Sequence, residues 1–101
     1  MSNPTAPNPN LRDARFAVPQ HVASRAFPTE MILLNLNTGE YHGLNPTGGR
    51  MYEVVDECGD LREAASRLAV ELGQPLESIF SDLLELCTGL VKRGLLETSR
   101  A

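Results

Sequence analysis

Few side chains in this sequence have the types and spacing that catalysis or metal binding requires. The histidines are His21 and His42, and the cysteines are Cys58 and Cys87. Neither histidine lies in a recognisable Ser-His-Asp or Cys-His frame, and no spacing of His, Cys and carboxylates resembles a zinc site. Each cysteine lies within an apolar periodic stretch, where a reduced thiol packs as a small hydrophobe. We therefore expect no enzymatic activity, no metal ion and no cofactor.

Residues 45–50 form a glycine-containing segment in front of a predicted helix. Their sequence, Asn-Pro-Thr-Gly-Gly-Arg, lacks the Gly-Lys-Ser/Thr ending of a phosphate-binding loop. Asn45 followed by Pro46 matches instead a helix N-cap with proline at the first helical position. The segment therefore predicts the start of a helix and no nucleotide site.

Composition and charge are those of one small globular domain with an acidic balance. The chain has 101 residues, of which 42% are hydrophobic and 22% charged, and its formal net charge is -4. Nucleic acids and anionic membrane surfaces attract clustered Lys and Arg, so we expect neither as a partner. The longest apolar run, residues 31–34, is far shorter than the roughly 20 residues of a membrane span. No signal-peptide pattern is present, and we expect a cytoplasmic protein.

Three segments predict the strands of an antiparallel meander. Residues 30–36 alternate apolar side chains between two faces with a period of two. A Pro-Thr turn connects residues 21–27 to this strand, and an Asn-Thr-Gly turn connects it to residues 40–44. We therefore expect a three-stranded antiparallel sheet in which the first and third strands are the edges.

Helical periodicity and capping residues predict three helices after the strands. They cover residues 46–58, 60–72 and 75–93, and a glycine follows each of them. Strands followed by helices imply an α+β fold with the helices on one face of the sheet.

Residues 1–15, which begin with a stretch rich in Pro and Asn, are expected to form a disordered tail, and residues 16–98 the folded domain.

The third predicted strand presents an unprotected edge. An edge strand exposes unpaired backbone N–H and C=O groups, which proteins usually protect with Lys, Pro or a bulge. Neither Lys nor Pro is present in the strand, which consists of Glu40, Tyr41, His42, Gly43 and Leu44. Gly43 permits the close approach of another backbone. The edge is therefore a candidate for β-augmentation by a peptide, unless the N-terminal segment or a second copy covers it.

The third predicted helix is apolar over more of its surface than one buried face requires. Its first apolar stripe is Ile79, Leu83, Leu86 and Leu90, and the adjoining stripe is Phe80, Leu84, Cys87 and Val91. Either both stripes pack inside the domain, or the second lines a groove for a partner. Asp82 and Glu85 lie on the flank, where they are either solvated or bind Arg or Lys of that partner.

The segment 34–55 resembles a motif of PqqD-like proteins, which are known as RiPP recognition elements. In these proteins a hairpin glycine precedes an aromatic residue, and Leu-Asn then opens a helix that carries Thr-Gly. The matching residues are Gly39, Tyr41, Leu44-Asn45 and Thr47-Gly48, followed by Leu68, Asp82-Leu83-Leu84, Leu90 and Gly94-Leu95-Leu96. The resemblance covers residues 22–96. It departs from the family at residues 35–37, where Asn-Leu-Asn replaces an acidic residue before the turn.

The resemblance implies a winged helix-turn-helix fold that binds the leader of a ribosomally made precursor peptide. The leader would add as a fourth strand to residues 40–44, against a helical wall of Phe80, Leu83, Leu84 and Cys87. The chain most resembles the stand-alone version found with lasso peptides, which hands the leader to a leader peptidase, a transglutaminase-like cysteine protease. A charge at Leu84 or Cys87 would then abolish leader binding and leave the fold intact.

Two other functions remain open at this point. A winged helix also serves DNA-binding regulators, but their recognition helices carry Lys and Arg to the phosphates. The second and third helices here mix both signs, with Glu63, Glu71, Asp82 and Glu85 against Arg62, Arg67, Lys92 and Arg93. The second alternative is a purely structural dimerisation module, in which the third strand pairs with its own copy. A leader-binding chain would form the same homodimer when no leader is bound.

Overall fold

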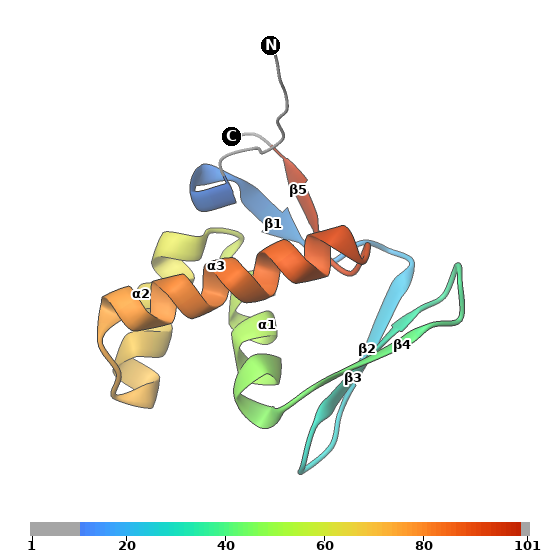
Figure 1. Cartoon of the computed structure of the whole chain (residues 1–101), viewed down its shortest axis with the longest axis horizontal. Coiled ribbons are helices and arrows are strands. Elements are labelled where there is room, and N and C mark those ends of the chain that lie inside the picture. The colour runs from blue at the N-terminus through green and yellow to red at the C-terminus, as the bar shows by residue number, and fades with distance from the viewer. Residues whose placement is uncertain (1–10, 100–101) are drawn as a thin grey trace.

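Two small antiparallel sheets and three helices make up the fold (Figure 1), for which the computed structural model describes residues 11–99. The elements are a short 3-10 helix (Leu11–Asp13), β1 (Arg15–Ala17), β2 (Val22–Ala26), β3 (Met31–Asn35), β4 (Tyr41–Leu44), α1 (Pro46–Cys58), α2 (Leu61–Leu72), α3 (Leu76–Lys92) and β5 (Glu97–Ser99). The larger sheet has the order β2-β3-β4. The predicted α+β fold, with a three-stranded antiparallel sheet followed by three helices, is confirmed.

The larger sheet turns one face toward the helices because its strands alternate. Burial along β3 follows a strict period of two, with Met31, Leu33 and Asn35 buried and the residues between them half-buried. The register pairs Met31 with Leu44 and Leu33 with His42, so these four side chains share the inward face. Leu33 and Leu44 join the hydrophobic core of the helices.

Capping residues set the boundaries of α1 and α2. The Asn45 side chain accepts a hydrogen bond from the Gly48 N–H at 2.7 Å, and the Asp60 side chain accepts one from the Arg62 N–H at 2.8 Å. Gly59 and Gly73 end the two helices with φ of 70° and 64°, in the left-handed region that glycine adopts without strain. The predicted starts and ends of these helices are confirmed.

The small sheet formed by β1 and β5 was not predicted. It joins the two ends of the described chain, with Phe16 paired to Thr98 at its centre. Phe16 is 4% exposed and packs in the core, where it anchors the N-terminal segment. Residues 11–15, which the sequence placed in the tail, form the 3-10 helix and the start of β1. Residues 1–10 lie outside the described part.

Within residues 11–99, no helix has the length and apolar character needed to cross a membrane. The same part of the chain holds no group of three or more His, Cys, Asp or Glu side chains arranged to bind a metal ion.

Candidate binding site at the free edge of the sheet

The outer edge of β4 has no strand beside it. In the part of the chain that the structure describes, β4 pairs only with β3, and β1 and β5 form a separate sheet. Neither of those strands lies beside this edge, since they are drawn on the other side of α3 from β4 (Figure 1). Five consecutive residues that the sequence assigned to the site, residues 40–44, therefore border an open strand edge.

The hydrogen-bond pattern identifies which backbone groups this edge presents. The Asn35 N–H donates to the Glu40 C=O at 2.9 Å, which sets the phase of the β3–β4 ladder. In an antiparallel pair, every second residue directs its N–H and C=O to its partner strand and the residues between direct theirs away. The backbone of His42 therefore faces β3, and the backbones of Tyr41 and Gly43 point outward from the free edge.

The side chains of β4 divide between the two faces of the sheet. His42 and Leu44 point inward, and Leu44 is buried. Tyr41 is on the outer face and is 74% exposed. A Cβ atom at Gly43 would lie 3.3 Å from Oε1 of Glu30, the mobile end of a long side chain. An added strand would therefore meet an almost bare backbone at Gly43.

His42 connects the edge strand to the end of α3. Partial burial lowers the pKa of the His42 imidazole, and the positive guanidinium of Arg93 lowers it further. Arg93 is the C-cap residue of α3, so the C-terminal end of α3 lies near enough to β4 for the Arg93 charge to act on His42.

The lowered pKa of His42 predicts that the protein becomes less stable in mild acid. His42 binds a proton more readily in the unfolded chain, where its pKa is about 6.5, than in the folded protein. The stability that neutral His42 contributes is complete above that pH and is lost as the pH falls through the lower folded value. Urea unfolding between about pH 5 and pH 8 measures this slope. His42→Gln should reduce it, and an unchanged slope in this variant would assign it to other groups.

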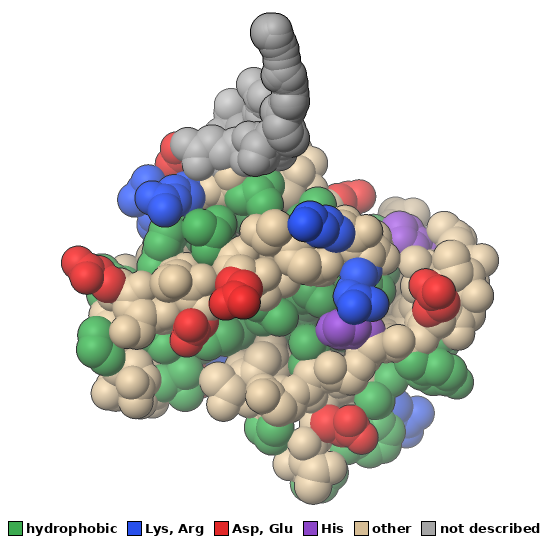
Figure 2. Space-filling model, in the orientation of Figure 1, with side chains coloured by type: hydrophobic (Ala, Val, Ile, Leu, Met, Phe, Trp, Pro, Cys, Tyr) green, Lys and Arg blue, Asp and Glu red, His purple; other side chains and the backbone are tan. Residues whose placement is uncertain are grey.

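One flank of α3 faces the gap beside β4. Residues 82, 86, 89 and 93 form a single row along the helix, because an α-helix has 3.6 residues per turn. Arg93 ends this row, and its positive charge acts on His42 of β4. At the other end, Asp82 lines a cavity of about 350 Å³ together with Thr47 and Met51 of α1. Figure 2 shows hydrophobic side chains in the gap between α3 and the sheet. We call the row Asp82, Leu86, Gly89 and Arg93 the strand-facing flank.

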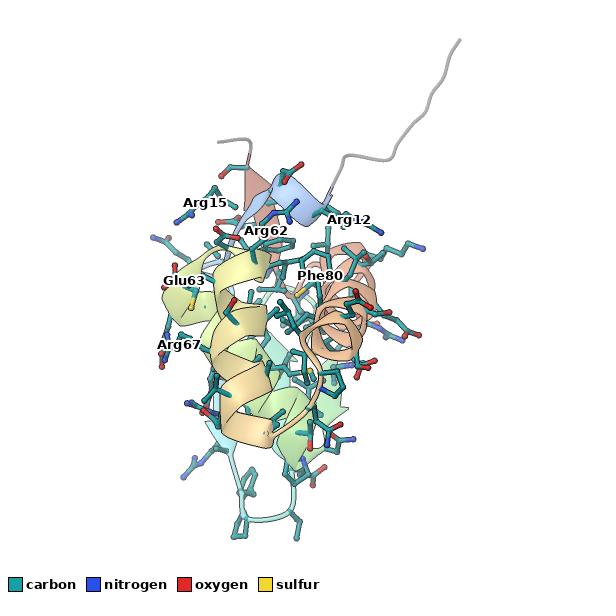
Figure 3. All side chains as sticks on the ribbon, turned by 90° about the vertical axis from the view of Figure 1, so that its left-hand side faces the viewer. Arg12, Arg15, Arg62, Glu63, Arg67 and Phe80 are labelled. Carbon is teal, nitrogen blue, oxygen red and sulfur yellow. The ribbon has the colours of Figure 1, made fainter. Side chains whose placement is uncertain are left out.

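The opposite flank of α3 carries Phe80 and Leu84. Both line a second cavity, of about 380 Å³, together with Arg12 and Arg62. The guanidinium carbons of these arginines lie 5.9 and 5.8 Å from the centre of the Phe80 ring, and Figure 3 shows the three side chains together between α2 and α3. The structure therefore separates Phe80 and Leu84 from β4, although the sequence analysis placed them in one groove.

Leu83 and Cys87, which the sequence also placed in the wall, lie in the hydrophobic core. Leu83 is 0% and Cys87 1% exposed. Burial raises the pKa of the Cys87 thiol to about 12, as expected for a thiol surrounded by apolar side chains. Asp82 and Glu85 are both exposed, and of the two only Asp82 belongs to the strand-facing flank.

The burial of Cys87 changes the expected effect of a charge at this position. Cys87→Asp should destabilise the fold by about 3 kcal/mol or more, because the carboxylate is buried without a partner. The sequence-based expectation that such a variant keeps its fold is therefore withdrawn. Urea unfolding measures the loss, with Cys87→Ala as the control that only opens a small cavity. Equal stability of the two variants would contradict the burial of this site.

Sequence reasoning did not single out Leu86, Gly89 and Arg93, which share the strand-facing flank with Asp82. Leu86 was expected in the core stripe but is only partly buried, and Cys87 occupies the core in its place. Gly89 could have been noticed in the sequence. A glycine in the interior of a helix weakens the helix, and no local feature of the sequence accounts for this one.

Comparisons with known proteins place this geometry in a family. Residues 30–96 match the family described as coenzyme PQQ synthesis protein D (PqqD). The fold is similar to a structure titled "TbiB1 in Complex with the TbiA(beta) Leader Peptide", with a TM-score of 0.75, 26% sequence identity, and coverage of 84% of this chain and 99% of that one. It is also similar to "Lasso peptide synthetase B1 complexed with the leader peptide", with a TM-score of 0.74, 23% identity, and coverage of 83% and 99%.

No curated protein sequence matches the chain. The family match spans β3, β4, all three helices and the turn that follows them, so it includes both the free edge and the strand-facing flank. The resemblance drawn from residues 34–55 is confirmed: this chain belongs to the PqqD family.

Proposed function

We propose that this chain binds the leader segment of a ribosomally synthesised precursor peptide, which adds as a fourth strand to β4 and lies against α3. The observation that carries the proposal is the unpaired edge of β4 beside the strand-facing flank of α3. Two structural relatives bear titles that name a bound leader peptide, and the more similar of them is 26% identical to this chain. The proposed ligand is an extended peptide, in the mode known as β-augmentation.

The backbone edge supplies a limited part of the binding energy. Tyr41 and Gly43 direct two N–H and two C=O groups outward, and each hydrogen bond adds about 1 kcal/mol net. Micromolar affinity requires about 8 kcal/mol, and the leader also loses conformational entropy when it becomes ordered. Apolar leader side chains, each contributing about 1.5–3 kcal/mol when buried, must supply the remainder. The flank of α3 beside β4 therefore decides which leader is bound.

Leader binding needs no chemistry from this chain, and we propose that it is not an enzyme. In this proposal it acts in the cytoplasm without a cofactor and presents the bound leader to a leader peptidase of the transglutaminase-like cysteine protease class. The free edge of β4 and the acidic net charge fit a peptide ligand better than DNA.

The test is a titration with the synthetic leader of a lasso-peptide precursor, chosen by locating a precursor gene beside the gene for this chain. We expect saturable binding by calorimetry and amide chemical-shift changes largest at Tyr41 and Gly43. A scrambled leader is the matched control. Failure of the leader to bind would refute the proposal, and so would shifts confined to the cavity around Phe80.

Two further arms of the experiment test the alternatives. Retardation of duplex DNA at low salt by this chain, without leader binding, would favour the winged-helix regulator. A molar mass that rises with concentration and falls when leader is added would show that β4 pairs with its own copy in the absence of leader.

A further inference from the structure

Gly89 is a glycine inside α3 for which the fold itself gives no reason. Glycine is among the least favourable residues for a helix interior, and its φ here is not in the left-handed region. A Cβ atom at Gly89 would meet no heavy atom within 4 Å, which leaves room for a side chain. Gly49 of α1 differs, because a Cβ there would lie 3.0 Å from the Cβ of Met31. Packing explains the glycine in α1 and leaves the one in α3 unexplained.

The open space at Gly89 lies where a fourth strand would pass. Gly89 is one turn before Arg93, whose guanidinium acts on His42 of β4. Leu86 precedes it on the same flank and is partly buried against the core. The elements that pack closely against α3 are α2, α1 and the 3-10 helix, and β4 is not among them. The space beside Gly89 is therefore open, and β4 is not closely packed against it.

We propose that Gly89 determines which leader side chain this protein accepts. In the complex, an inward-facing side chain of the added strand lies directly over Gly89 and fills the space that a Cβ would take. The inference rests on the proposed function, because it names the position on α3 that a bound leader contacts. It also explains why α3 keeps a residue that weakens the isolated helix: the missing side chain makes room for the ligand.

The test is the variant Gly89→Ala, which should be more stable than the parent chain and bind leader less well. Alanine has a higher helix propensity and meets open space, so we expect the melting temperature to rise by about 4 °C. The added methyl group occupies space that the leader needs, and we expect about tenfold weaker binding of the synthetic leader. Ser81→Ala, at an exposed position outside the strand-facing flank, is the control and should leave affinity unchanged.

An alanine scan of the leader against both proteins identifies the side chain concerned. At one leader position, truncation should weaken binding to the parent chain and restore part of the affinity of Gly89→Ala. Equal leader affinity of Gly89→Ala and the parent, or the same scan profile for both, would overturn this inference. A parent chain that binds no leader would instead refute the proposed function, so the two failures are distinguishable.

Discussion

Replacing Gly43 with proline should weaken leader binding more than tenfold and leave the folded structure intact. The Gly43 N–H points away from β3, so proline removes a donor that the free protein does not use. The pyrrolidine ring also occupies the place where a leader carbonyl would accept that hydrogen bond. The lost hydrogen bond alone amounts to about 1 kcal/mol. The ring also prevents the leader backbone from approaching β4 to the spacing that strand pairing requires. Calorimetric titration with the synthetic leader measures the change.

Two variants separate this effect from general damage to β4. Gly43→Ala keeps the N–H and adds a Cβ that meets the mobile end of Glu30 and, at ordinary contact distance, Cδ1 of Ile32, so its affinity should stay within a few-fold of the parent. His42→Pro removes the N–H that points toward Leu33 in the β3–β4 ladder, and we expect this variant to lose stability. Equal leader binding by Gly43→Pro and Gly43→Ala would show that the leader does not pair with this edge.

Local sequence signals predicted the elements of this fold because those elements depend on local interactions. The period-two pattern of β3 and the caps Asn45 and Asp60 act within a few residues, so they could be identified without tertiary information. β1 and β5 are three residues each and are held by pairing between the two ends of the described chain. No pattern within either segment predicts a partner some 80 residues away, which is why this small sheet was missed.

The free edge of β4 could be predicted from the sequence, and the rotation of α3 could not, for a related reason. Strand order follows from two short turns, so β4 had to be an edge of the meander. The rotation of α3 about its axis depends on where α2 packs, and two adjoining apolar stripes fit either rotation equally well. Cys87 took the core position expected for Leu86, and Phe80 turned toward Arg12 and Arg62. The apolar width of α3 was evident from the sequence, but its orientation was not.

Leu86→Ala should weaken leader binding about tenfold, whereas Leu84→Ala should leave it nearly unchanged. The two leucines are a matched pair, since both are partly buried and both pack against the core from the same helix. Leu86 belongs to the strand-facing flank, and Leu84 lines the cavity beside Arg62 on the opposite flank. Truncation of Leu86 removes apolar surface that an ordered leader would cover, and a buried leucine side chain contributes about 1.5–3 kcal/mol. Leader titration of both variants measures the difference.

Stability measurements on Leu86→Ala and Leu84→Ala show whether a difference in their leader affinity could arise from a difference in folding. Both truncations remove the same atoms from half-buried sites, so urea unfolding should show similar losses for the two variants. A difference in leader affinity between proteins of equal stability can then be assigned to the flank that each residue occupies. A larger loss of affinity for Leu84→Ala would place the leader against α2 and Phe80, and the free edge of β4 would then no longer explain binding.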